Sequence, residues 1–189
     1  MLTQLILHLP TWEMIRVLGI SAYVMLFVGV SLGICYSMPG RSGKAKANLY
    51  KIHSAATVSG MFLGMFHAML LVIDTYEPFG WTQILVPFSA ADKPLFTGLG
   101  TIAAYGMVLI ILTTDLRNKL NKKVWRLIHI SAYPTFIAAL IHGIGVGTDT
   151  KNGWVFLMYV ATTMIVTVLF IIRAFIGGKR SLAHTASRG

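Results

Sequence analysis

The sequence is poor in charge, in cysteine and in the short motifs of soluble catalytic domains. Only 12% of its 189 residues are charged, about half the share that is usual in soluble globular domains. Cys35 is the single cysteine, so no disulfide can form within the chain. The sequence contains no glycine-rich dinucleotide fingerprint, no zinc-ligand spacing and no basic helix with an aromatic stacking motif. Nucleic-acid binding and nicotinamide chemistry within this chain are therefore not predicted.

Long apolar runs are what the sequence has instead. Hydrophobic residues make up 56% of the chain, and five runs reach the length of about 20 residues that an α-helix needs to cross a bilayer. They leave no room for a soluble catalytic domain. We therefore predict an all-α integral membrane bundle of about five transmembrane helices, forming a single domain over residues 1–189, with spans at residues 12–36, 47–73, 95–114, 124–146 and 154–176.

The placement of charge predicts the orientation of the bundle. The formal net charge is +10, and all basic residues except Arg16, Lys93 and Lys151 fall on one side of the predicted spans. All acids except Asp115 fall on the other side. By the positive-inside rule the basic side is cytoplasmic, where it favours anionic headgroups. The prediction is a multi-pass protein of the plasma (cytoplasmic) membrane with its N-terminus outside and its C-terminus in the cytoplasm.

Four histidines inside the predicted spans form two matched pairs. His53 and His67 are fourteen residues apart in the second span, and His129 and His142 are thirteen apart in the fourth. Each separation covers roughly 20 Å along a helix, and the two spans run in the same direction. His53 and His129 are thus expected level with each other near the cytoplasm, and His67 and His142 level near the outside. Ionisable groups at such depth are costly and usually functional, and imidazole is a common axial ligand of haem iron.

The depth of the histidines is predicted more clearly than the face of the helix on which each one lies. Fourteen residues bring His67 back to within about 40° of the face of His53, and thirteen leave His142 about 140° from His129. Pro134 lies between the latter two and is expected to distort the helix, because it removes a hydrogen bond and crowds the carbonyl of Ile130. Gly60 is midway between His53 and His67, where a missing side chain would leave space for a macrocycle.

Simpler roles remain open for several of these residues. Membrane histidines also hydrogen-bond neighbouring helices, and glycines such as Gly60 and Gly64 also permit close helix packing. His8 and His184 lie outside the spans and are expected in solvent. The four tryptophans fall near the predicted membrane interfaces and are expected to belong to the aromatic belts; they are Trp12, Trp81, Trp125 and Trp154.

Residues 112–129 carry a resemblance to a known family. The loop residues Thr114-Asp115-Leu116-Arg117, followed by Lys122-Lys123-Val124-Trp125-Arg126-Leu127-Ile128-His129, resemble the ferric reductase-like transmembrane family, in which a basic loop opens a haem-binding helix. The four-histidine spacing is similar too, so the resemblance covers roughly residues 47–147. Members include ferric reductases, the membrane part of NADPH oxidases and the haem-binding membrane subunit of methionine sulfoxide reductase systems. The chain departs from them in having five predicted spans instead of six and no flavin or nicotinamide domain.

The resemblance implies a di-haem cytochrome b with two non-covalent haem b groups. His53 and His129 would ligate the inner haem iron and His67 and His142 the outer one, each with its second ring nitrogen on a hydrogen-bond acceptor. Arg126, Lys51 and Lys123 could pair with propionates of the inner haem, or could serve the positive-inside topology alone. Arg16 is a weaker candidate for the propionates of the outer haem. Ligation by two histidines leaves no open position on iron, which favours electron transfer over chemistry at the metal.

The electron donor expected from the resemblance is a cytoplasmic flavoprotein reductase that meets the basic rim. Ferric iron, oxygen, a quinone and a protein all remain open as the terminal acceptor, and the oligomeric state is open as well. Two other functions remain alternatives. The chain could be the cytochrome b anchor subunit of a quinone-linked dehydrogenase, or a haem-free structural or transport protein in which the histidines serve packing or proton movement.

Overall fold

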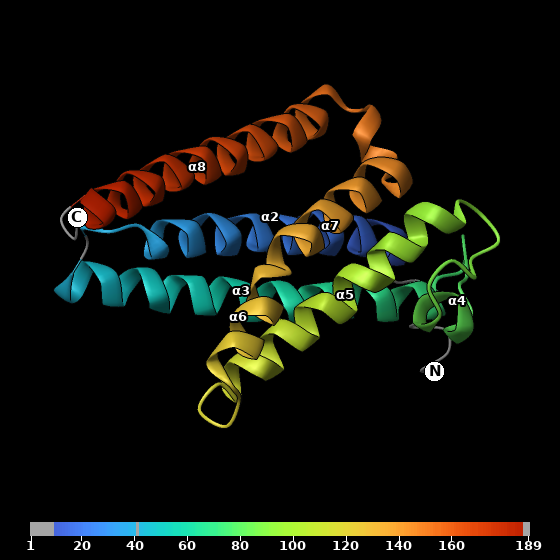
Figure 1. Ribbon diagram of the computed structural model, residues 1–189. Coiled ribbons are helices and arrows are strands. Elements are labelled where there is room, and N and C mark those ends of the chain that lie inside the picture. The colour runs from blue at the N-terminus through green and yellow to red at the C-terminus, as the bar shows by residue number, and fades with distance from the viewer. Residues whose placement is uncertain (1–9, 41, 187–189) are drawn as a thin grey trace.

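The computed structural model describes residues 10–40 and 42–186, and every regular element in this part of the chain is a helix (Figure 1). The all-α prediction is confirmed. The elements are α2 (Thr11–Ser37), α3 (Gly43–Ile73), α4 (Trp81–Leu85), α5 (Pro94–Asp115), α6 (Lys122–Ile130), α7 (Ala132–Val146), the 3-10 turn η1 (Thr148–Lys151) and α8 (Gly153–Ala186).

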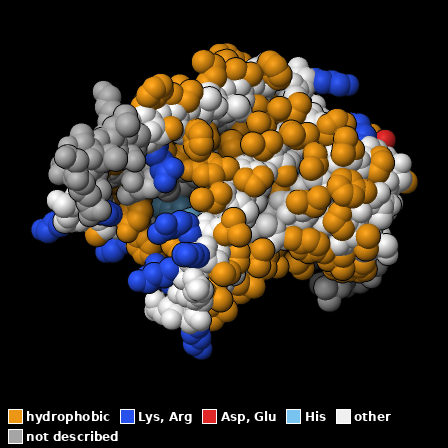
Figure 2. Space-filling model, in the orientation of Figure 1, with side chains coloured by type: hydrophobic (Ala, Val, Ile, Leu, Met, Phe, Trp, Pro, Cys, Tyr) orange, Lys and Arg blue, Asp and Glu red, His pale blue; other side chains and the backbone are white. Residues whose placement is uncertain are grey.

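Five helical segments are long and apolar enough to cross a membrane: Thr11–Ser37, Gly43–Ile73, Pro94–Asp115, Lys122–Val146 and Gly153–Ile176. They agree with the five predicted spans to within a few residues, except that the second helix begins four residues earlier, at Gly43. Large hydrophobic side chains are exposed along all five segments, and Figure 2 shows them covering most of one face, with most of the visible Lys and Arg gathered toward one end. The chain is therefore a multi-pass membrane protein.

The helices pack as two antiparallel pairs with α8 against the first pair. α2 lies along most of α3, and α5 lies along α7 (Figure 1). The buried core lies where α2, α7 and α8 meet. There the Tyr23 ring stacks on Phe136 at 5.6 Å and meets Tyr159 edge-on at 4.8 Å, while the Tyr23 hydroxyl shares a hydrogen bond of 2.7 Å with Thr162. This core fixes α2 and α7 relative to each other, and both helices contribute to the candidate site.

The fourth span is broken between two of the predicted histidines. α6 ends at Ile130, where the N–H of Ser131 donates to the carbonyl of Ile128 at 3.0 Å, and α7 begins at Ala132. Pro134 is the third residue of α7, in the first turn, where a helix has no internal partner for its N–H groups. The distortion predicted near Pro134 is therefore an interruption of the helix at Ser131. It changes the rotation that an unbroken helix would impose between His129 and His142.

Candidate functional site

The structure brings the four span histidines together as two facing pairs. The ring centres of His53 on α3 and His129 on α6 are 6.3 Å apart, with the ring planes at 68°. The ring centres of His67 on α3 and His142 on α7 are also 6.3 Å apart, at 82°. The rings of a pair are neither parallel nor joined by a hydrogen bond. Each pair therefore meets edge to face, with ring centres at the wide end of the range for such contacts.

The backbones that carry the facing rings are not closely packed. α3 packs on α2 and, to a smaller extent, on α5, but it makes few close backbone contacts with α6 or α7. Helices in membranes normally approach one another through small residues and packed side chains. Here the histidine pairs join α3 to the α6–α7 segment, although the backbones of these helices are not closely packed.

Three of the four imidazoles are fixed by backbone carbonyls of a neighbouring helix. The Nδ1 atom of His53 donates to the carbonyl of Gly29 at 2.7 Å, and that of His67 donates to the carbonyl of Ile15 at 2.9 Å. The Nδ1 atom of His142 donates to the carbonyl of Phe96 at 2.9 Å. A carbonyl only accepts, so the ring proton lies on Nδ1, and Nε2 of the neutral imidazole keeps its lone pair. This is the form in which imidazole binds a metal.

A glycine lies four residues after each of these carbonyls and makes room for the ring. A Cβ atom on Gly19 would lie 3.0 Å from Nδ1 of His67, and one on Gly33 would lie 3.2 Å from Cε1 of His53. A Cβ atom on Gly100 would lie only 2.5 Å from Nδ1 of His142. On a helix, residues four apart are neighbours on one face, so the glycine sits beside the accepting carbonyl. We call each carbonyl with its glycine a ring seat.

The two ring seats of α2 repeat at the spacing of the histidines that they hold. Ile15 and Gly29 are fourteen residues apart, as are Gly19 and Gly33, and this is also the separation of His53 and His67. The sequence analysis missed these residues. The signal that could have found them is the fourteen-residue repeat of glycine in the first span, read together with the same repeat of histidine in the second.

His129 is held differently from the other three. Its Nδ1 atom is buried without a hydrogen-bond partner among the residues that the structure describes. Its ring instead stacks on Trp125, with ring centres 5.1 Å apart and an angle of 25°. On the antiparallel helices α5 and α7, Gly100 lies beside His142 and Gly106 lies beside Thr135. Counting further along α5 at the same spacing brings Thr113 near the level of His129. Thr113 is not a glycine, and its hydroxyl donates to the Leu109 carbonyl at 2.7 Å. The α5 helix therefore has no ring seat at the level of His129.

Gly60 is buried against α2, where an added Cβ would lie 3.1 Å from Cβ of Met25 and 3.4 Å from the carbonyl oxygen of Ala22. Its missing side chain therefore permits close packing of α2 and α3, which is the simpler role that the sequence left open for it. A role in clearing space for a macrocycle stays a prediction, because face and depth within α3 do not specify which neighbouring helix covers that face.

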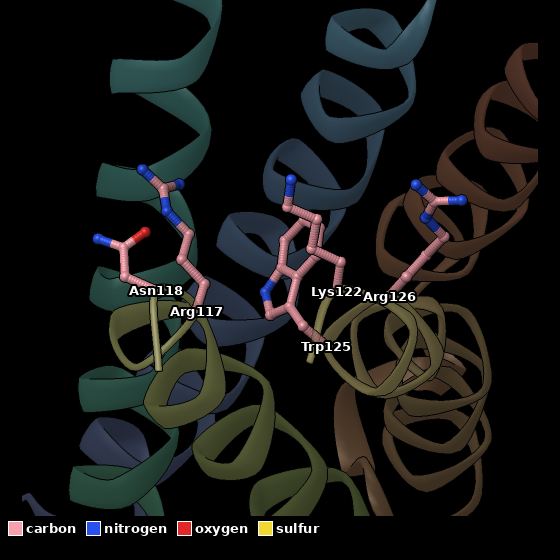
Figure 3. Close-up of a pocket in the computed structure, with 5 residues that line it drawn as sticks. All are labelled: Arg117, Asn118, Lys122, Trp125 and Arg126. Carbon is pink, nitrogen blue, oxygen red and sulfur yellow. The ribbon is translucent and has the colours of Figure 1, made fainter. Parts of the chain in front are cut away.

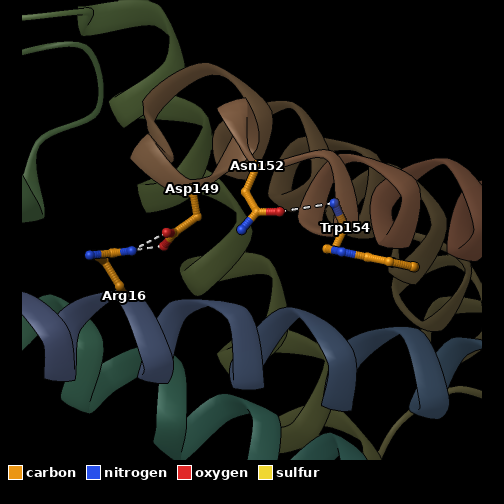
Figure 4. Close-up of polar contacts among 4 residues, drawn as sticks. All are labelled: Arg16, Asp149, Asn152 and Trp154. Atoms are coloured by element: carbon orange, nitrogen blue, oxygen red, sulfur yellow. Dashed lines mark hydrogen bonds and ion pairs between the residues drawn. The ribbon is translucent and has the colours of Figure 1, made fainter.

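The basic residues predicted near the site have different surroundings. Arg16 pairs with the Asp149 carboxylate through Nε, at 2.7 Å, and through Nη2 (Figure 4). These hydrogen bonds hold the pKa of Asp149 below its ordinary value. Arg16 thus has a protein carboxylate as its partner and ties α2 to η1. Lys51, Lys123 and Arg126 are exposed and make no ion pair within the described residues.

A second polar contact closes the same end of the bundle. The Thr11 hydroxyl at the start of α2 donates to the Asp74 carboxylate at 2.5 Å, and the backbone N–H of Glu77 donates to it at 2.9 Å. Burial by itself raises the pKa of Asp74, but these hydrogen bonds outweigh it and bring the pKa below its ordinary value. The ends of α2 and α3 near the His67–His142 pair are therefore fixed by buried polar contacts.

Within residues 10–40 and 42–186 no group of three or more His, Cys, Asp or Glu side chains could hold a metal ion. A haem iron needs only two protein ligands, because the macrocycle supplies the others. A pair of histidines is therefore smaller than a group of three and does not count as one. His8 lies outside the described residues, and so does the side chain of His184. Comparison with models of protein families, with curated proteins and with solved structures found no match.

Proposed function

We propose that this chain is a di-haem b-type membrane cytochrome that carries electrons across the bilayer. The observation that carries the proposal is the separation of the paired rings. An imidazole nitrogen that binds a metal would lie about 2 Å from it and the ring centre about 1.2 Å further, so two imidazoles that bind one ion from opposite sides would have centres about 6.4 Å apart. The 6.3 Å separation of the ring centres in both pairs is close to this value. Its occurrence twice, at two depths, favours two equivalent sites over chance.

The chain's own residues supply what such sites need. His53 and His129 would hold one haem, and His67 and His142 the other, each through Nε2. The ring seats support this assignment because a hydrogen bond at Nδ1 orients a ligating histidine and raises its basicity. Haem supplies one-electron redox chemistry when bound. With two histidines on each iron no position is open to a substrate, so the arrangement favours electron transfer.

Arg126, with Lys51 and Lys123, is proposed to neutralise propionates near the His53–His129 pair. The donor is proposed to be a cytoplasmic flavoprotein that meets the basic rim, by resemblance to the ferric reductase-like family. In that direction electrons enter at the His53–His129 level and leave at the His67–His142 level. The remaining exposed cations at the same end favour an acidic partner surface.

The proposed orientation is tested by reporter fusions. Because basic residues concentrate around the start of α3, from the turn after α5 into α6, and from the last part of α8 to the end of the chain, the positive-inside rule places these ends of the helices in the cytoplasm. Fusions at Gly43, Asn121 and Gly189 should therefore report a cytoplasmic location, and fusions at Gly80 and Asn152 an outside one. A cytoplasmic signal from Gly80 would reverse the orientation and with it the direction of electron flow.

The function itself is tested by the visible spectrum of the purified protein. We expect a low-spin b-type spectrum, because two imidazoles on iron give a strong ligand field, and a pyridine haemochrome assay should count two haem b groups per chain. Extraction with acidified solvent should release both, since the chain has no cysteine pair for thioether links. A colourless protein purified from haem-supplemented cells would refute the proposal and favour the haem-free alternative.

A further inference from the structure

A basic pocket lies at the end of the bundle nearest the His53–His129 pair. It has a volume of about 220 Å³ and is lined by Arg117, Asn118, Lys122, Trp125 and Arg126 (Figure 3). These residues come from the turn after α5 and the first turns of α6. In Figure 3 the three basic side chains extend in the same direction, with the indole ring of Trp125 between Arg117 and Arg126. Three positive charges from two neighbouring segments thus line one pocket.

The charge of this pocket is not balanced by protein. None of its lining residues is acidic, and within the described chain the only ion pair is that of Arg16 with Asp149. Arg117 contacts the neutral ring of Tyr50, at 5.9 Å from its centre, and donates to its hydroxyl at 3.4 Å. Three cations held together without a carboxylate repel one another, so an anion between them is stabilising.

The pocket also contains a hydrogen-bond donor that the protein leaves unused. The Nε1–H group of Trp125 is buried and has no partner among the described residues. Indole only donates, and so do the guanidinium and ammonium groups beside it. A ligand that satisfies all of them must offer several acceptor oxygens and negative charge. A phosphate group has this chemistry, and Arg and Lys are its usual protein partners.

Apolar surface adjoins the pocket on the same segments. Leu116 precedes Arg117 and is 48% exposed, Val124 precedes Trp125 and is 47% exposed, and Leu127 follows Arg126 and is 73% exposed. A soluble anion would gain nothing from this surface, whereas a lipid would cover it with acyl chain. Basic pockets beside transmembrane helices at the cytoplasmic face are known binding sites for anionic headgroups.

We propose that this pocket binds the phosphodiester headgroup of an anionic phospholipid. The phosphate lies between Arg117 and Lys122 and accepts the Trp125 indole N–H, while the acyl chains lie on Leu116, Val124 and Leu127. Arg126 borders the pocket and keeps the propionate role proposed above. Because Trp125 stacks on His129, the bound lipid also holds in place the ring beside the histidine that has no carbonyl partner. The proposal does not depend on haem, because none of the four paired histidines lines the pocket.

Native mass spectrometry of the purified protein with added phosphatidylglycerol or phosphatidylcholine tests this site. We expect one phosphatidylglycerol to be retained and phosphatidylcholine to be lost. The double variant Arg117→Gln/Lys122→Gln should weaken retention about 30-fold, since each basic residue near an anionic membrane surface contributes about fivefold. Lys44→Gln/Lys119→Gln is the matched control: it removes the same charge from the same end but touches no lining residue, and it should retain the lipid. Trp125→Phe should weaken retention less, because only one donor is lost.

Several results would overturn the proposal. Equal loss in both double variants would mean a general charge effect, and equal retention of phosphatidylcholine would mean no headgroup selection. Quenching of Trp125 fluorescence by inorganic phosphate, with no competition from phosphatidylglycerol, would assign the pocket to a soluble phosphate. A changed visible spectrum or haem content in Arg117→Gln/Lys122→Gln would assign it to a haem propionate. Circular dichroism on each variant checks that the helices are intact, and Trp125→Phe keeps the test informative if the double variant does not fold.

Discussion

Replacing His67 or His142 with alanine is expected to lower the haem content from two groups per chain to one. Each substitution removes one of the two axial ligands at that level, and the space between the rings then has a ligand on one side only. Replacing His53 or His129 should remove the other haem and leave the first. The measurement is a haemochrome assay on each purified variant, with a redox titration to show which of the two components has disappeared.

The melting temperature supplies a second readout of the same substitutions. A tightly bound group that prefers the folded state stabilises it by mass action, so loss of one haem should lower the melting temperature as well as the absorbance. His184→Ala is the control histidine variant, because it lies outside the four paired residues, and it should keep both haems. Full haem content in all four single variants would refute the assignment, and loss of both haems from every variant would mean general unfolding.

The two pairs are not expected to behave alike. Both histidines of the His67–His142 pair have a carbonyl partner at Nδ1, whereas His129 has none. A ligating imidazole without such a partner is a weaker base and is less firmly oriented. The haem at the His53–His129 level is therefore expected to have the higher reduction potential of the two if all else is equal, and its position relies more on the stacking of Trp125 on His129.

Much of the fold was predictable because a bilayer constrains a chain strongly. Runs of about 20 apolar residues leave few alternatives to spanning helices, and the five predicted spans are confirmed. The depth of each histidine followed from the same constraint. Depth is set by counting residues from the charged ends of a span, so His53 could be matched with His129, and His67 with His142, without knowing how the helices pack.

Rotation and neighbours could not be predicted in this way. On an unbroken helix, the thirteen-residue separation would leave His129 and His142 on different faces, yet both rings face histidines of α3 and the helix is interrupted between them at Ser131. The local sequence indicated a distortion at Pro134 but did not locate this interruption. The sequence left two roles open for Gly60, and it could not show that the helix beside Gly60 is α2. The ring seats depend on which carbonyl lies opposite each imidazole, which is a property of two helices together and is absent from either sequence alone.

The second prediction follows from the ring seats: one methyl group added at a seat glycine should displace the histidine ring that the seat holds. In Gly100→Ala the new Cβ would lie 2.5 Å from Nδ1 of His142, closer than real contacts allow. Either the ring or the helix that carries it must then shift, which disturbs the hydrogen bond from His142 Nδ1 to the Phe96 carbonyl. We expect the affinity for the haem at the His67–His142 level to fall by about 10- to 100-fold, the usual cost of losing a partner that orients a ligand, with the other haem unaffected.

Gly64→Ala is the matched control for this prediction, because it makes the same change in α3, three residues before His67. Its nearest neighbour would be Cβ of Ala22 at 4.0 Å, an ordinary contact, so both haems should stay. Gly33→Ala should instead weaken the haem at the His53–His129 level, since its Cβ would lie 3.2 Å from the His53 ring. Haem titration of the three variants separates the cases. Unchanged haem affinity in Gly100→Ala would show that the glycines serve helix packing alone. Equal losses in Gly64→Ala and Gly100→Ala would show the same, because a ring seat predicts a loss only where the new methyl group meets a histidine ring.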